Sequence, residues 1–235
     1  MQSEDTRRRF LGLAAGGIAA SLAVPAWTQQ KATPRPPKPV GDEGVAPPED
    51  LMREHGLLNR VLLIYEEINK RILHSRDFDP KLLSDSAGLI HHFIEDYHEK
   101  LEEDHLFPRF RKAGKLVDLV DTLQAQHQAG RRITLRLEQF TAADLKSNDA
   151  RRTVVGHIDD FLRMYRPHEA REDTVLFSEF RNIVSKHEFD ALGEQFEKKE
   201  HELFGEEGFE KNVALVASME KQLGIYDLAQ FTPKS

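Results

Sequence analysis

Two ten-residue segments share a pattern of histidine and glutamate that could bind metal. Residues 98–107 read His-Glu-Lys-Leu-Glu-Glu-Asp-His-Leu-Phe, and residues 168–177 read His-Glu-Ala-Arg-Glu-Asp-Thr-Val-Leu-Phe. On a helix, a spacing of four residues places the first histidine and the second glutamate on one face, one turn apart. Each segment could therefore offer one nitrogen and one bridging carboxylate to a metal centre, from His98 with Glu102 and from His168 with Glu172.

A solvated run of polar residues is the alternative for either segment taken alone. The duplication favours a shared buried site. His55 and His127 favour it too, because they fall on the apolar stripes of other predicted helices. Burying a neutral polar group without a partner costs roughly 2–7 kcal/mol, and a bound metal would serve all these side chains at once.

The absence of cysteine limits any metal to nitrogen and oxygen ligands and excludes disulfides, iron–sulfur clusters and thiol catalysis. Imidazole with carboxylate suits a hard to borderline cation, so iron or manganese fits better than copper. Zinc is possible but does not need six ligands.

Four predicted helices must position these residues. Inner-face residues recur at alternating steps of three and four. The four stripes are Leu51, His55, Leu58, Leu62, Tyr65, Asn69 and Ile72; Ala87, His91, Ile94, His98, Leu101 and His105; Leu116, Val120, Leu123, His127, Gly130, Thr134 and Leu137; and Val154, Ile158, Phe161, Tyr165, His168, Glu172 and Val175.

Proline and glycine set the expected ends of these helices. The second should start after Pro80 and end near Pro108, and Pro167 should kink the fourth just before His168. Short connections between long helices predict an all-α, antiparallel up-down four-helix bundle. A further helical stretch, roughly 188–222 and broken around glycines 205 and 208, adds a C-terminal helical segment.

The pattern resembles the hemerythrin-like family, also called the HHE cation-binding domain, from about Asp50 to Ser218. The resemblance implies an oxo- or hydroxo-bridged pair of iron ions that binds dioxygen or another small diatomic or peroxide ligand. The ligands that it implies are His55, His98, Glu102, His127, His168 and Glu172.

The chain departs from the oxygen-carrying members of that family. Those have two histidines four residues apart in the third helix, whereas Arg131 stands four residues after His127 here. In the fourth helix, this chain uses Glu172 where the carriers use an aspartate one residue later as the ligand. His201 and Glu99 are candidates to complete the site, with water as the alternative occupant.

The remaining histidines have plainer interpretations. We expect His91, His105 and His157 to make core or supporting hydrogen bonds. We expect exposed positions for His74, His92 and His187.

The N-terminus reads as an export signal. Residues 6–11, Thr-Arg-Arg-Arg-Phe-Leu, precede an apolar run that ends at Val24-Pro25-Ala26, and the arginines resemble a twin-arginine signal. The domain prediction is a signal peptide at 1–26, a proline-rich linker at 27–49, the helical bundle at 50–222 and a tail at 223–235. A periplasmic location and no stable membrane insertion after cleavage follow from this interpretation, and an uncleaved anchor is the alternative.

Composition narrows the function further. The net charge of -7 and the lack of a basic patch beyond the N-terminus argue against a nucleic-acid partner. Glu-x-x-His on two helices, as in ferritin-like proteins, and the H-E-x-x-H of zincins do not occur in the required places. We expect an oxygen-binding or sensing protein, with iron storage or donation, or a di-iron oxidoreductase acting on peroxide or nitric oxide, as alternatives.

Overall fold

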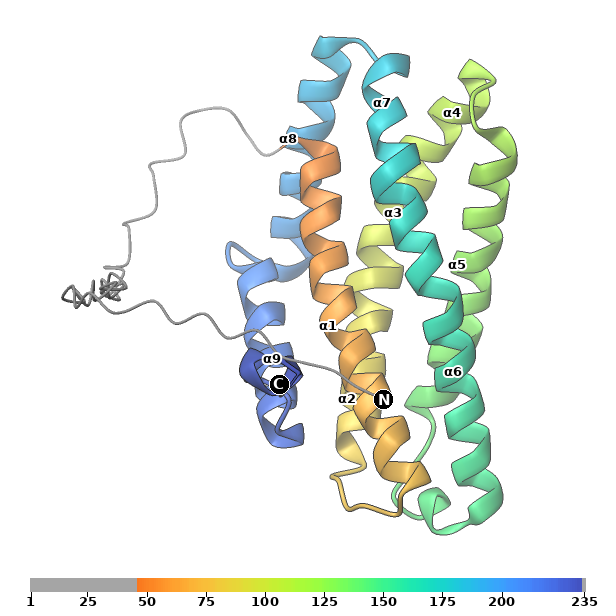
Figure 1. Cartoon of the computed structure of the whole chain (residues 1–235). Coiled ribbons are helices and arrows are strands. Elements are labelled where there is room, and N and C mark those ends of the chain that lie inside the picture. Colours follow the sequence, from red (N-terminus) through yellow and green to blue (C-terminus); the bar gives the residue numbers. More distant parts are fainter. Residues whose placement is uncertain (1–45, 234–235) are drawn as a thin grey trace, which may run out of the picture. The chain divides into compact units, whose positions relative to one another are not determined.

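The computed structural model describes residues 46–233, whose regular secondary structure is helical, with no strand in that range. Long helical rods lie side by side along most of their length (Figure 1). The first rod is α1 (Pro47–Leu73) and the third is α5 (Val117–Glu138). The predicted all-helical bundle is confirmed. The predicted signal peptide and most of the predicted linker lie outside the described residues.

The second and fourth rods each combine α-helical and π-helical turns. The second contains α2 (Lys81–Leu89), η1 (Ile90–His98), α3 (Glu99–Leu101), η2 (Glu102–Leu106) and α4 (Phe107–Ala113). The fourth contains α6 (Asn148–Arg171), η4 (Glu172–Leu176) and α7 (Phe177–Ile183). The segments η1, η2 and η4 are π-helices, whose i→i+5 pairing fits one extra residue into a turn.

Because of this extra residue, two positions of the predicted inner-face stripes are wrong. His105 and Val175 are only half-buried, whereas Leu106 and Leu176, one residue later, are fully buried. The inner face therefore moves forward by one residue where η2 and η4 interrupt the α-helical period.

Two prolines lie within these rods, and the first acts differently from the prediction. Pro108 does not end the second rod, because it lies in the first turn of α4, where a missing N–H is tolerated. Pro167 lies inside α6, which continues to Arg171.

Most predicted core positions are buried. All seven stripe residues of α1 are buried, as are those of α5 from Val120 to Leu137. The bundle begins at Pro47 rather than near Asp50, since two prolines occupy the first turn of α1, the position in a helix that suits them.

Two further helices form the predicted C-terminal segment. These are α8 (Lys186–Phe204) and α9 (Gly208–Leu223), so the helix is interrupted between the two expected glycines. Both contact α1, and α9 also contacts α2, so this segment lies against the side of the bundle (Figure 1). Short 3-10 helices, η3 (Asp144–Lys146) and η5 (Leu228–Phe231), lie before α6 and after α9. None of the helices described between residues 46 and 233 has the length and apolar character that a bilayer span requires.

Gly130 provides a test of the packing between α5 and α6. A Cβ atom at Gly130 would lie 2.0 Å from the hydroxyl oxygen of Tyr165, a fully buried side chain, whereas a Cβ at Gly56 of α1 would meet nothing within 4 Å. Gly130→Ala should lower the free energy of unfolding by about 1–3 kcal/mol through overpacking. Gly56→Ala, the matched control, should raise it by about 0.5–1 kcal/mol. Urea denaturation measures both, and equal effects would contradict the packing described here.

Candidate metal centre

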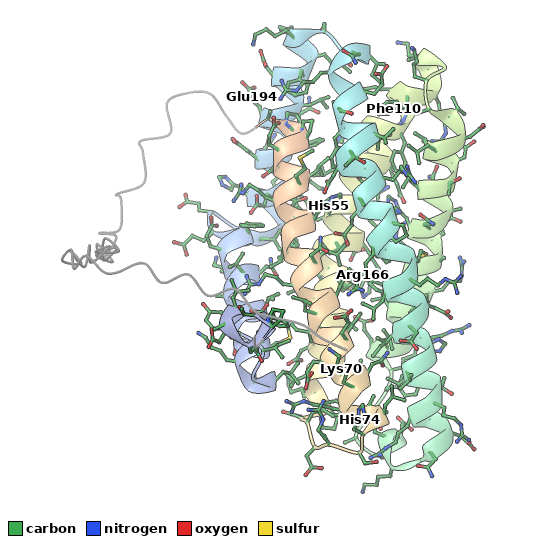
Figure 2. All side chains as sticks on the ribbon, viewed as in Figure 1. His55, Lys70, His74, Phe110, Arg166 and Glu194 are labelled. Atoms are coloured by element: carbon green, nitrogen blue, oxygen red, sulfur yellow. The ribbon has the colours of Figure 1, made fainter. Side chains whose placement is uncertain are left out.

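The structure brings all six predicted ligands together in the interior. They form two groups, His55 with His98 and Glu102, and His127 with His168 and Glu172, and the ligand atoms within each group lie within 4.8 Å of one another. Every one of the six is buried, and His127, Glu102 and Glu172 are 0% exposed. The side chains that fill the space between the rods, including His55 on α1, are drawn in Figure 2.

The four histidines form two similar pairs. The Nε2 atoms of His55 and His98 are 3.1 Å apart, and their ring centroids are 4.7 Å apart. The Nε2 atoms of His127 and His168 are 3.2 Å apart, with ring centroids 5.0 Å apart. Each pair therefore points two nitrogens at one place.

The two glutamates join the pairs. Oε2 of Glu102 lies 3.9 Å from Nε2 of His98 and 3.4 Å from Nε2 of His127. Oε2 of Glu172 lies 3.1 Å from Nε2 of His168 and 3.4 Å from Nε2 of His55. All four carboxylate oxygens of these glutamates are buried and lack a hydrogen-bond partner. Their oxygens are thus placed to bridge the two halves of the site.

The outer nitrogen of each histidine has its own acceptor. The four Nδ1 contacts are His55 with Asp173 at 2.7 Å, His98 with Glu54 at 2.6 Å, His127 with Glu103 at 3.1 Å and His168 with Gln126 at 2.9 Å. Carboxylates and a side-chain carbonyl only accept, so each Nδ1 donates its hydrogen outwards. This fixes the tautomer that leaves an Nε2 lone pair facing inwards in each neutral ring, as in metal-binding histidines.

Protons would compete with a metal ion for the inward-facing nitrogens and carboxylate oxygens. Burial alone disfavours charge on His55, but its hydrogen bond to Asp173 and the nearby carboxylate of Glu172 raise the pKa of this histidine well above its usual range. Burial and the charge of His55 hold the pKa of His98 well below its usual range. Burial and the charge of Glu172 raise the pKa of Glu102 to about 7. A cation at this site would replace protons as the partner of these groups.

The four orienting residues were not predicted, although their positions in the sequence carry a signal. Glu54 and Gln126 directly precede a site histidine. Glu103 and Asp173 directly follow a site glutamate. The first two orient the other histidine of their own pair, whereas the last two reach across to the other pair.

The same repeat extends to the surrounding contacts. Phe177 stacks on His55 and Phe107 on His127, with ring centroids 5.6 and 5.4 Å apart. Asn59, four residues after His55, donates to Glu169, whereas Arg131, four residues after His127, lies 2.8 Å from Glu99. The phenylalanine that ends each ten-residue segment thus covers one histidine of the site. The centre has an approximate two-fold internal symmetry.

The comparisons with known proteins agree with this repeat. The family model for the hemerythrin HHE cation binding domain matches residues 46–152 and 118–232. Each match begins nine residues before a site histidine, from 46 to 55 and from 118 to 127. The chain belongs to the hemerythrin HHE cation-binding family.

Relatives in two mycobacterial species share nearly the whole chain. Uncharacterized protein Rv1995 of Mycobacterium tuberculosis (strain ATCC 25618 / H37Rv) is 45% identical over 231 residues, which are 97% of this chain and 91% of the relative. Uncharacterized protein Mb2018 of Mycobacterium bovis (strain ATCC BAA-935 / AF2122/97) gives the same values. No solved structure matches the chain.

The other candidate residues of this HHE domain lie outside the six-residue cluster. Glu99 accepts from the Tyr165 hydroxyl at 2.6 Å and faces the outer nitrogen of His127 at 4.0 Å, so it belongs to the supporting shell. Arg131, four residues after His127, binds Glu103 at 2.8 Å. His201 is exposed on α8 and does not reach the centre.

The remaining histidines have the expected exposure, but of the three for which hydrogen bonds were expected, only His91 makes one within the described part of the chain, to Glu138. His74, His92 and His187 are exposed. His91, His105 and His157 are half-buried and contact Glu138, Phe196 and Phe140, respectively, rather than the centre.

The donor set fits the cations for which the family is named. Four inward imidazole nitrogens and four unpartnered carboxylate oxygens meet in a buried space, which is a costly arrangement without a shared positive partner. The ligand types suit iron or manganese.

The acceptors of His98 and His168 differ in chemistry, a carboxyl group from Glu54 and an amide from Gln126, and this difference is testable. Glu54→Gln should weaken metal binding by about 10-fold or more, because a carboxylate acceptor makes imidazole a stronger ligand than an amide does. Gln126→Glu should strengthen it. Competition with a chromophoric chelator for Fe²⁺ measures both. Gln128→Glu, an exposed position on the same helix, is the matched control and should leave the affinity unchanged. An Fe²⁺ affinity that changes in neither Glu54→Gln nor Gln126→Glu would contradict the orienting role of these two residues.

Proposed function

We propose that this protein is an exported, non-haem di-iron protein that binds or senses dioxygen or a related small molecule, on an antiparallel up-down four-helix bundle. The observation that carries the proposal is the convergence of four imidazole lone pairs on two unpartnered carboxylates. His55 and His98 would hold one iron, His127 and His168 the other, and Glu102 and Glu172 both.

The chain's own residues prepare the site for this role. The acceptors at Nδ1 keep each imidazole turned towards the centre, and the two glutamates balance part of the cationic charge. Phe107 and Phe177 cover the histidines and limit the access of water. When bound, a reduced iron pair supplies electrons to a ligand such as dioxygen.

Burial favours a small ligand over an organic substrate. Glu102, His127 and Glu172 are 0% exposed, so a molecule larger than a diatomic or a peroxide would have to displace core side chains to reach them. Six ligand residues also account for two ions rather than for a large iron store. Export is proposed from the N-terminal sequence alone, through the twin-arginine-like segment and the apolar run after it.

Metal content tests the proposal. Protein purified from its native compartment should contain about two irons per chain and absorb in the near ultraviolet. Glu102→Gln and Glu172→Gln should each lose metal, because an amide oxygen is a weaker ligand than a carboxylate. Glu95 is also buried and lies on the same rod as Glu102, but outside the cluster. The control variant Glu95→Gln should therefore keep both ions. Zinc alone, or no metal in the unmodified protein, would refute the di-iron proposal.

Exposure of the reduced, iron-loaded protein to air separates the functional classes. A reversible spectral change is expected for oxygen binding, and rapid irreversible oxidation for sensing. Catalytic loss of peroxide or nitric oxide would instead identify an oxidoreductase. Uptake of many more than two irons per chain would identify a storage protein.

A further inference from the structure

A second cluster of metal-binding side chains lies on the surface of the second rod. Nε2 of His91 is 3.7 Å from Oδ2 of Asp96, and Nδ1 of His92 is 3.6 Å from the same oxygen. Three ligand atoms from these residues lie within 4.8 Å of one another. We propose that His91, His92 and Asp96 bind a single divalent transition-metal ion such as Zn²⁺, separately from the buried centre.

The π-helix η1 creates this arrangement. His92 and Asp96 are four residues apart, whereas His91 and Asp96 are five residues apart. In an α-helix only the first spacing keeps two side chains on one face. The i→i+5 pairing of η1 brings the second pair together as well, so both histidines face one carboxylate.

A carboxylate on α5 orients His91. Nδ1 of His91 lies 3.1 and 3.2 Å from the two carboxylate oxygens of Glu138. Because a carboxylate only accepts, Nδ1 carries the hydrogen, and the lone pair of the neutral ring lies on Nε2, the nitrogen nearer Asp96. Three of the four buried histidines are oriented by carboxylates in the same way, an arrangement typical of metal ligands.

The distances and the exposure suit a zinc ion that exchanges with solvent. Ligands about 2.0–2.1 Å from zinc lie roughly 3.3 Å apart in a tetrahedron, so 3.6 and 3.7 Å need only small side-chain rotations. The side chains of His92 and Asp96 are 70% and 60% exposed, which leaves room for both the rotation and a water ligand. This proposal does not depend on the metal or function of the buried centre.

Calorimetric titration of Zn²⁺ into the full chain tests the proposal, with the buried centre left as purified. The unmodified protein should bind one Zn²⁺ that His92→Gln and Asp96→Asn each weaken by at least about 10-fold. Glu138→Gln should weaken it less, since Glu138 orients one ligand. His187→Gln, another exposed histidine, is the control and should leave the affinity unchanged.

The side chains of His92, Asp96 and His187 are exposed and that of Glu138 is half-buried, so the variants should keep their helical circular dichroism. Equal Zn²⁺ affinity in the unmodified protein, His92→Gln and Asp96→Asn would overturn the proposal. The same loss in His187→Gln, or no Zn²⁺ bound outside the buried centre of the unmodified protein, would also overturn it.

Discussion

Four imidazole nitrogens that face one another in the protein interior are the constraint on which the rest of the structure depends. Their outer nitrogens already donate to Glu54, Glu103, Gln126 and Asp173, so the inner nitrogens must find a positive partner. Two buried carboxylates without hydrogen bonds lie between them. Protons could satisfy some of these groups, but a pair of cations satisfies all of them at once.

The helices meet this constraint through an internal repeat and local π-helical turns. Each half contributes one histidine from a regular helix and a histidine-glutamate pair from a rod with π-type pairing. The segments η2 and η4 begin at Glu102 and Glu172, and the acid after each reaches a histidine of the opposite half. In each segment, the glutamate lies in the cluster and the acid that follows it orients a histidine of the other pair. Short π-helical segments are frequent at functional sites for this kind of reason.

Local periodicity allowed much of the fold to be predicted. The stripe of α1 and the ligands His98 and Glu102 follow from steps of three and four, which are properties of one helix. Whether Asp173 orients His55 depends on how two distant helices pack, so spacing could not reveal it. The π-helical turns also escaped prediction, because one extra residue leaves no compositional trace. His105 and Val175 were assigned to the core for that reason.

The central claim is that two cations lie among the six inward-facing ligands. Anomalous diffraction at the iron absorption edge, from crystals of protein purified with its native metal, tests it most directly. Two peaks are predicted, one beside His55 and His98 and one beside His127 and His168, with Glu102 and Glu172 between them. No peak within this cluster, or a peak only elsewhere on the molecule, would contradict the account.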